Sequence, residues 1–166
     1  MSLESLNAMS ATEAAEVLRT CCAADRWVEG MVAARPFADR DDLHSKAEAL
    51  WPAMTERDWL AAFDAHPKIG DVKSLKAKYA NTHALASGEQ SSTAVASDDV
   101  LHRLKDGNDA YHEKFGFIFI VCATGKSADE MLALLEARLP NTREQEIENA
   151  GREQAKITHL RLDKLV

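Results

Sequence analysis

The chain has 166 residues, of which 46% are hydrophobic and 28% are charged, a composition that suits one folded domain and excludes a disordered chain. Its net charge of −7 at pH 7 argues against nucleic acid or an anionic membrane as the main partner. A small anionic substrate remains compatible with this charge, because one nearby cation dominates the potential inside a pocket.

The sequence pattern over residues 1–65 predicts a series of helices separated by short breaks. Ser10 with Glu13, and Thr55 with Asp58, have the three-residue spacing of N-terminal capping pairs. The apolar residues of the second helix recur with helical spacing, and a proline follows them. The predicted helices lie at 12–22, around 27–32, at 41–51 and at 56–65, and RPF at 35–37 ends the second.

The helical pattern stops at 66–90 and resumes from Val100 to Phe115. The apolar run FIFIVCA at 117–123 has no partner strand, and an isolated strand is unstable. It is therefore predicted to be a buried extended segment or a helical turn. A further helix is predicted from residue 127 and closed by Pro140, and Thr142 with Gln145 caps the last one. The predicted fold is all-α, in a single domain over 1–166.

Arg161 stands out in the last predicted helix. Residues spaced three or four positions apart form one stripe along that helix. The stripe consists of Ile147, Ala150, Gln154, Ile157, Arg161 and Leu165. A charge in such a stripe must reach solvent, form a pair or bind something. The commoner outcome is an arginine that extends to solvent, and the alternative is a guanidinium that grips a substrate carboxylate.

His66 lies in HPKIGD at 66–71, directly after the fourth predicted helix. Pro67 disfavours the α conformation of the residue before it, so the helix is predicted to end by about residue 65. Histidine titrates near neutral pH and can exchange protons with a substrate. From the residues alone, a histidine that simply caps a helix C-terminus is the commoner explanation, and a histidine that exchanges protons is the alternative.

Glu89 lies in the short motif SGEQ at 87–90. A glutamate in the first turn of a helix is stabilised by the helix dipole, which needs no function. Alternatively, Glu89 faces His66 and orients its imidazole or holds it protonated. The residues leave both explanations open.

The remaining residue patterns exclude several classes of site. Cys21, Cys22 and Cys122 are too few and badly spaced for a disulfide framework or a zinc site, so they are expected to be buried, reduced thiols of a cytoplasmic protein. The histidines lack metal-binding spacing, and G-x-S-x-G, P-loop and G-x-G-x-x-G motifs are absent. No secretory leader and no membrane span is predicted.

The chain resembles the 2-oxo-4-hydroxy-4-carboxy-5-ureidoimidazoline (OHCU) decarboxylase family of urate degradation. Five stretches carry the resemblance, in the family's order and over nearly the whole chain. They are WVEGMVAARPF at 27–37, HPKIGD at 66–71, SGEQ at 87–90, NDAYHEKFGFIFIVCATGKS at 108–127 and NTREQEIENAGREQAKITHLRLDKL at 141–165.

This resemblance implies an all-α, cofactor-independent enzyme, commonly a homodimer, that converts OHCU to (S)-allantoin with loss of CO₂. It implies that His66 and Glu89 are catalytic and that Arg161 binds the substrate. It also implies that the substrate pocket is lined by Pro67, Gln90, Phe117, Ile118 and Phe119. Two alternatives stay open: a non-catalytic helical module that binds a ureide or purine-like ligand, and a metal-dependent hydrolase.

Overall fold

The computed structural model describes residues 1–67, 73, 75 and 98–166. Throughout these residues the regular backbone is helical and includes no strand, which confirms the predicted all-α fold. No helix in these ranges combines the length and the apolar character needed to cross a bilayer. The chain divides into two units, one of Met1–His66 with Asn149–Val166 and one of Pro67–Glu148. The single domain over 1–166 stays a prediction.

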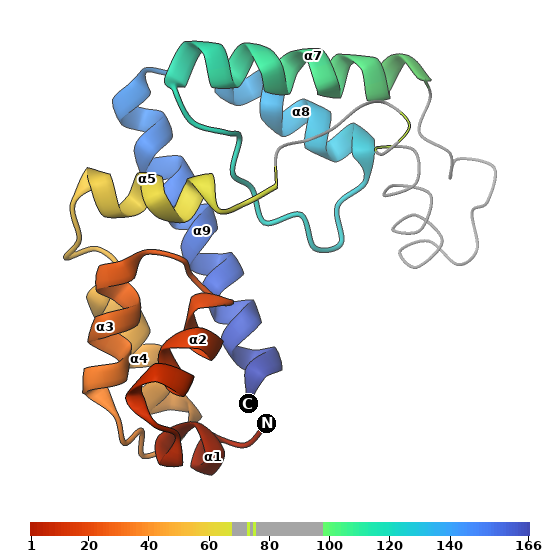
Figure 1. Ribbon diagram of the computed structural model, residues 1–166. Coiled ribbons are helices and arrows are strands. Elements are labelled where there is room, and N and C mark those ends of the chain that lie inside the picture. The colour runs from red at the N-terminus through yellow and green to blue at the C-terminus, as the bar shows by residue number, and fades with distance from the viewer. Residues whose placement is uncertain (68–72, 74, 76–97) are drawn as a thin grey trace, which may run out of the picture. The chain divides into compact units, whose positions relative to one another are not determined.

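The first unit contains α1 to α5 and the C-terminal part of α9 (Figure 1). The Ser10 hydroxyl accepts the Glu13 backbone N–H at 3.2 Å, and Thr55 and Asp58 form a reciprocal capping box, as predicted. The first helix was not predicted, because its six residues are too few to show a periodic pattern. The bounds are α1 Leu3–Ala8, α2 Ala11–Arg19, α3 Asp25–Ala34, α4 Arg40–Leu50, α5 Glu56–Asp64 and α9 Arg143–Leu165.

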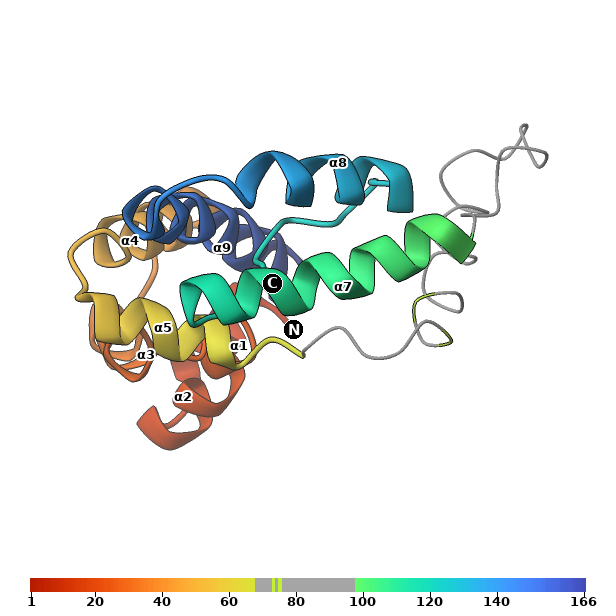
Figure 2. The same ribbon diagram turned by 90° about the horizontal axis from the view of Figure 1, so that it is seen from above.

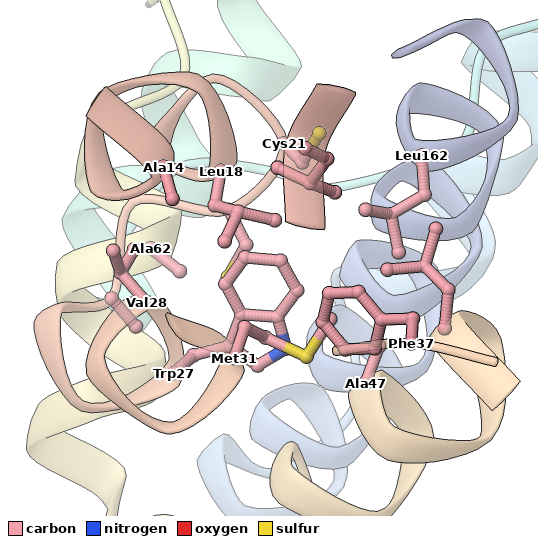
Figure 3. Packing of buried hydrophobic residues seen from close by; sticks show 14 residues of the cluster. Ala14, Leu18, Cys21, Trp27, Val28, Met31, Phe37, Ala47, Ala62 and Leu162 are labelled. Carbon is pink, nitrogen blue, oxygen red and sulfur yellow. The ribbon is translucent and has the colours of Figure 1, made fainter. Parts of the chain in front are cut away.

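Helix α3 is central to the first unit, since it packs against α2, α4 and α5. Figure 3 shows the side chains of Trp27 and Met31 from this helix meeting Phe37 in the middle of the hydrophobic cluster. Leu162 approaches the same cluster from α9. Burial of side chains of this size contributes about 1.5–3 kcal/mol each relative to exposure. The cluster is therefore the main source of stability of the first unit.

The buried face of α9 differs from the predicted stripe in its C-terminal half. Ile147, Ala150 and Gln154 are buried as expected, but the face continues through Thr158 and Leu162. Arg161 is exposed, so it does not interrupt an apolar face. Steps of three and four residues both keep a side chain near one face of a helix. The sequence pattern therefore located the face but misplaced it by one residue at its C-terminal end.

The second unit contains α7 (Asp98–Phe115) and α8 (Ala128–Arg138), which pack against each other. Figure 2 shows the two helices alongside one another, joined by an extended connection that runs back to the start of α8. Gly107 permits a close approach, because a Cβ there would lie 2.6 Å from a Leu135 methyl carbon. Gly116, with φ of +83°, ends α7 in a conformation that favours glycine.

The connection between α7 and α8 is extended (Figure 2), which is one of the two conformations predicted for FIFIVCA. Phe117, Phe119, Ile120 and Cys122 have buried side chains. The helix after it begins at a capping box of Ser127 and Glu130 and ends two residues before Pro140. The Thr142 hydroxyl then accepts the Gln145 backbone N–H at 3.1 Å, which confirms the predicted start of α9.

A buried ion pair ties the segments of the second unit together. The Glu146 carboxylate is 0% exposed and accepts hydrogen bonds from Arg138 Nε at 2.7 Å, the Tyr111 hydroxyl at 2.6 Å and Asn141 Nδ2 at 2.9 Å. Arg138 also donates to the Ile120 carbonyl at 2.7 Å. Burial, and then the hydrogen bond to Glu146, raise the pKa of Tyr111, so its phenol stays protonated and donates. One carboxylate thus links α7, the extended connection, α8 and the first turn of α9.

Glu146→Ala is expected to lower the free energy of unfolding by about 3–5 kcal/mol, because it leaves the Arg138 guanidinium buried without its counter-ion. The matched control is Glu136→Ala, which removes an exposed bidentate partner of Arg103 and is expected to cost about 1 kcal/mol or less. Denaturant unfolding followed by circular dichroism measures both. Equal losses in the two variants would contradict the central role of the buried pair.

Leu162→Ala is expected to destabilise the protein by about 2–5 kcal/mol, because it leaves a cavity in the core of the first unit. Leu160→Ala, two residues away on the same helix, is expected to change stability by about 0.5 kcal/mol or less, since Leu160 is 38% exposed whereas Leu162 is 0% exposed. The same unfolding measurement compares them. A larger loss for Leu160→Ala would place the buried face of α9 elsewhere.

Candidate active site

His66 lies just beyond the C-terminal end of α5, as Pro67 predicts. The helix ends at Asp64, and the His66 backbone N–H makes a last bond to the Phe63 carbonyl at 3.1 Å. The imidazole is half-buried, while Pro67 is exposed. The backbone therefore fixes the direction of the histidine side chain where the helix stops.

A glutamine from α9 holds the His66 ring. Gln154 Oε1 lies 2.5 Å from His66 Nε2, and the Gln154 side chain is only 1% exposed. On its other side, Gln154 Nε2 donates to Thr158 Oγ1 at 3.1 Å. A buried amide is stable only when both of its ends find partners. The glutamine is thus itself fixed while it contacts the histidine.

The two neighbouring cysteines are adjacent to this polar row. Burial raises the pKa of Cys22 to about 11, and nearby Thr158 acts in the opposite direction, so Cys22 remains a thiol. Burial raises the pKa of Cys21 as well. All three cysteines are buried, as expected for packed thiols.

Arg161 lies on the same stretch of α9, seven residues beyond Gln154. Its Nη1 donates to the Thr20 carbonyl at 3.4 Å, and the side chain is otherwise exposed to solvent. Positions 154, 158 and 161 follow one another by four and three residues, so they share one side of the helix. Arg161 therefore brings a positive charge to the side of α9 that contacts His66.

The surroundings of His66 favour its neutral form. Burial is the largest effect and lowers the pKa of His66, the bond to Gln154 acts in the opposite direction, and the charge of Arg161 lowers it further. A histidine with a lowered pKa is unprotonated at neutral pH and can accept a proton. The sequence-predicted pair of His66 and Arg161 thus belongs to one unit and is electrostatically coupled.

The other predicted site residues lie elsewhere along the chain. Glu89 and Gln90 lie outside the described residues. Phe117 and Phe119 are buried in the second unit, where both rings contact Tyr111, and Ile118 is half-buried. The guanidinium of Arg138 lies over the Phe119 ring, 4.6 Å from its centroid.

Two other histidines, His44 on α4 and His159 on α9, lie next to each other. His44 Nδ1 is 2.6 Å from His159 Nδ1, and His44 Nε2 is 2.8 Å from Asp163 Oδ1. Because Asp163 engages the far nitrogen of His44, the three groups do not converge on one point. Among residues 1–67, 73, 75 and 98–166, no three His, Cys, Asp or Glu side chains are placed to hold a metal ion.

Gln154 and Thr158 were not predicted as site residues. Gln154 was placed on the inward stripe of the last helix, and a glutamine at such a position is itself a signal. A buried amide needs partners, so it indicates a polar contact somewhere in the interior. Which residue would supply that contact was not deducible, because His66 lies 88 positions away in the sequence.

The chain is similar to known proteins over most of its length. The family model of OHCU decarboxylase matches residues 7–163. The chain is 34% identical over 147 residues to the "Uric acid degradation bifunctional protein TTL" of Arabidopsis thaliana, covering 89% of this chain and 45% of that protein. It is 31% identical to the 2-oxo-4-hydroxy-4-carboxy-5-ureidoimidazoline decarboxylase of Mus musculus, covering 80% of this chain and 74% of that one.

A solved structure has the same fold. The crystal structure of an OHCU decarboxylase in the presence of (S)-allantoin matches with a TM-score of 0.71 and 36% identity, over 89% of this chain and 94% of that chain. The chain spans less than half the length of the Arabidopsis relative. The family model, by contrast, covers almost the entire chain. The chain therefore belongs to the OHCU decarboxylase family.

Proposed function

We propose that this chain converts OHCU to (S)-allantoin and CO₂ without a cofactor. The observation that carries the proposal is the half-buried, neutral His66, held at 2.5 Å by buried Gln154 and acted on by the charge of Arg161. Membership of the OHCU decarboxylase family supports the choice of substrate. In this proposal the enzyme is a cytoplasmic homodimer.

The substrate supplies its own electron sink. OHCU carries a carboxylate and a hydroxyl on one ring carbon, next to a ring C=N. When the bond to the carboxylate breaks, its electron pair forms a C=C bond and the C=N pair moves to nitrogen, which takes up a proton. The hydroxyl of the resulting enol then loses its proton, and the ureido-bearing carbon gains one. The protein must therefore supply binding, a proton carrier and one face for protonation.

His66 is the proton carrier in this scheme. Its neutral imidazole takes the proton of the enol hydroxyl and returns a proton to the ureido-bearing carbon. Delivery from one face yields the S product, whereas solvent would protonate both faces. Glu89 is the second catalytic residue of the proposal.

Arg161 binds the anionic part of the substrate. Its guanidinium is exposed and makes one long hydrogen bond of 3.4 Å to a backbone carbonyl, so donors remain for a carboxylate. The remaining substrate-binding residues of the proposal, which line the pocket, are Pro67, Gln90, Phe117, Ile118 and Phe119.

His66→Asn is expected to lower kcat/KM for OHCU by about 10²–10⁴-fold, because asparagine cannot carry a proton. The matched control is His102→Asn, on the exposed face of α7, which should retain the wild-type rate. Urate oxidase and hydroxyisourate hydrolase generate OHCU in situ, and circular dichroism follows (S)-allantoin. If the wild-type chain does not exceed spontaneous decay, the proposal is wrong, and tight ureide binding without turnover would indicate a binding module instead.

Arg161→Leu is expected to raise KM by about 10–100-fold, because a charge-assisted hydrogen bond to the substrate is lost. The same change should raise the pKa of His66, because it removes a positive charge that disfavours the imidazolium. Arg152→Leu is the control, since Arg152 is exposed on the same helix. Steady-state kinetics and NMR titration of His66 measure the two effects, and an unchanged KM would remove Arg161 from substrate binding.

A further inference from the structure

Gln154 is a polar side chain on the buried face of α9, and its contacts have a defined polarity. Its carbonyl oxygen lies 2.5 Å from His66 Nε2, and its amide nitrogen lies 3.1 Å from Thr158 Oγ1. At 1% exposure, neither end of the amide is available to bulk water. The side chain therefore acts through its two protein partners.

The hydrogen atoms in this row can be placed by exclusion. An amide oxygen only accepts hydrogen bonds, so His66 must carry a proton on Nε2 to donate to it. The Thr158 hydroxyl oxygen accepts a hydrogen bond from the amide nitrogen of Gln154. The row therefore runs from His66 through Gln154 to Thr158, with one hydrogen directed along each contact.

We propose that Gln154 is a positioning residue that holds His66 as the Nε2–H tautomer and leaves Nδ1 as the nitrogen that takes the substrate proton. In a neutral imidazole one nitrogen is a donor and the other an acceptor. Within the described part of the chain, His66 Nδ1 makes no hydrogen bond. The proposal rests on the proposed role of His66 in proton transfer.

An amide suits this position better than a carboxylate would. When Nδ1 takes a proton, the bond from Nε2–H to the Gln154 oxygen strengthens, which supports the imidazolium. A carboxylate at the same distance would hold the imidazole protonated before substrate arrives. Gln154 opposes the pKa-lowering effects of burial and of the Arg161 charge without overturning them. The neutral amide thus keeps the histidine free to accept.

Side-chain ¹⁵N NMR of the full chain, without substrate, tests the tautomer. The His66 signals are assigned by their loss in His66→Asn. The wild type is expected to show Nε2–H, and Gln154→Glu is expected to show Nε2–H with a higher His66 pKa. Gln154→Met, which has similar length and no acceptor, should give a mixture of tautomers and a lower pKa. The control, Gln145→Met on the exposed first turn of α9, should leave His66 unchanged.

The pH profile of kcat/KM tests the consequence for the reaction. Gln154→Met should lose about tenfold at neutral pH, the effect of one hydrogen bond to an ionising group, with its acid limb moved to lower pH. Gln154→Glu should move the acid limb to higher pH and regain activity above it. KM should change little in either variant, because Gln154 does not contact the substrate.

An Nδ1–H tautomer in the wild type would overturn the proposal, as would a folded Gln154→Met chain that titrates and turns over like the wild type. If Gln154→Glu fails to fold, Thr158→Val is measured in its place. Loss of the Thr158 hydroxyl removes the partner that fixes the Gln154 amide. The His66 tautomers should then become mixed, as in Gln154→Met. The NMR result needs no turnover. A chain that shows Nε2–H but no decarboxylation therefore refutes the proposed function and not the tautomer assignment.

Discussion

The α9 helix carries buried polar side chains, and each needs a partner from another part of the chain, because an unpaired buried polar group costs about 1–3 kcal/mol. Near its start, Glu146 takes the hydrogen bonds of Arg138, Tyr111 and Asn141 in the second unit. Farther along, Gln154 meets His66 in the first unit. The Gly151 carbonyl of the same helix accepts the Trp51 indole N–H at 3.0 Å. The hydrogen-bonding groups of one helix thereby determine several of the buried polar contacts in each unit.

This arrangement explains how the His66 side chain is held at the end of a short helix. A helix terminus alone would leave the imidazole free to rotate. Here the end of α5 before Pro67 fixes the direction of the backbone at His66. The orientation of the imidazole ring is fixed by Gln154, which is itself held by Thr158. Two constraints of different origin, one from the backbone and one from a side chain, thus fix the direction of one imidazole ring.

Local sequence features predicted the elements well, because their causes are local. Capping residues at 10, 55 and 142 begin helices, and Pro140 follows the end of α8. Pro67 correctly placed the end of α5 before His66. The apolar run at 117–123 is a buried extended segment, which is one of the two alternatives predicted for it.

The candidate site was less predictable, because it depends on contacts between distant residues. The bond between His66 and Gln154 joins positions 88 apart, and no local pattern specifies such a pairing. Arg161 was assigned to the inward stripe of α9, although Leu162 takes that place. The error arises because steps of three and of four residues both approximate 3.6 residues per turn. The predicted Glu89 and Gln90 lie outside the described residues.

The three buried thiols have a practical consequence for studying the folding of this protein. Cys21 and Cys22 lie in the first unit and Cys122 in the second, and all three are buried. A thiol reagent can reach a buried cysteine only when the surrounding structure opens, so its labelling rate reports the free energy of that opening. The native cysteines therefore provide a built-in probe of local unfolding in each unit, without any engineered label.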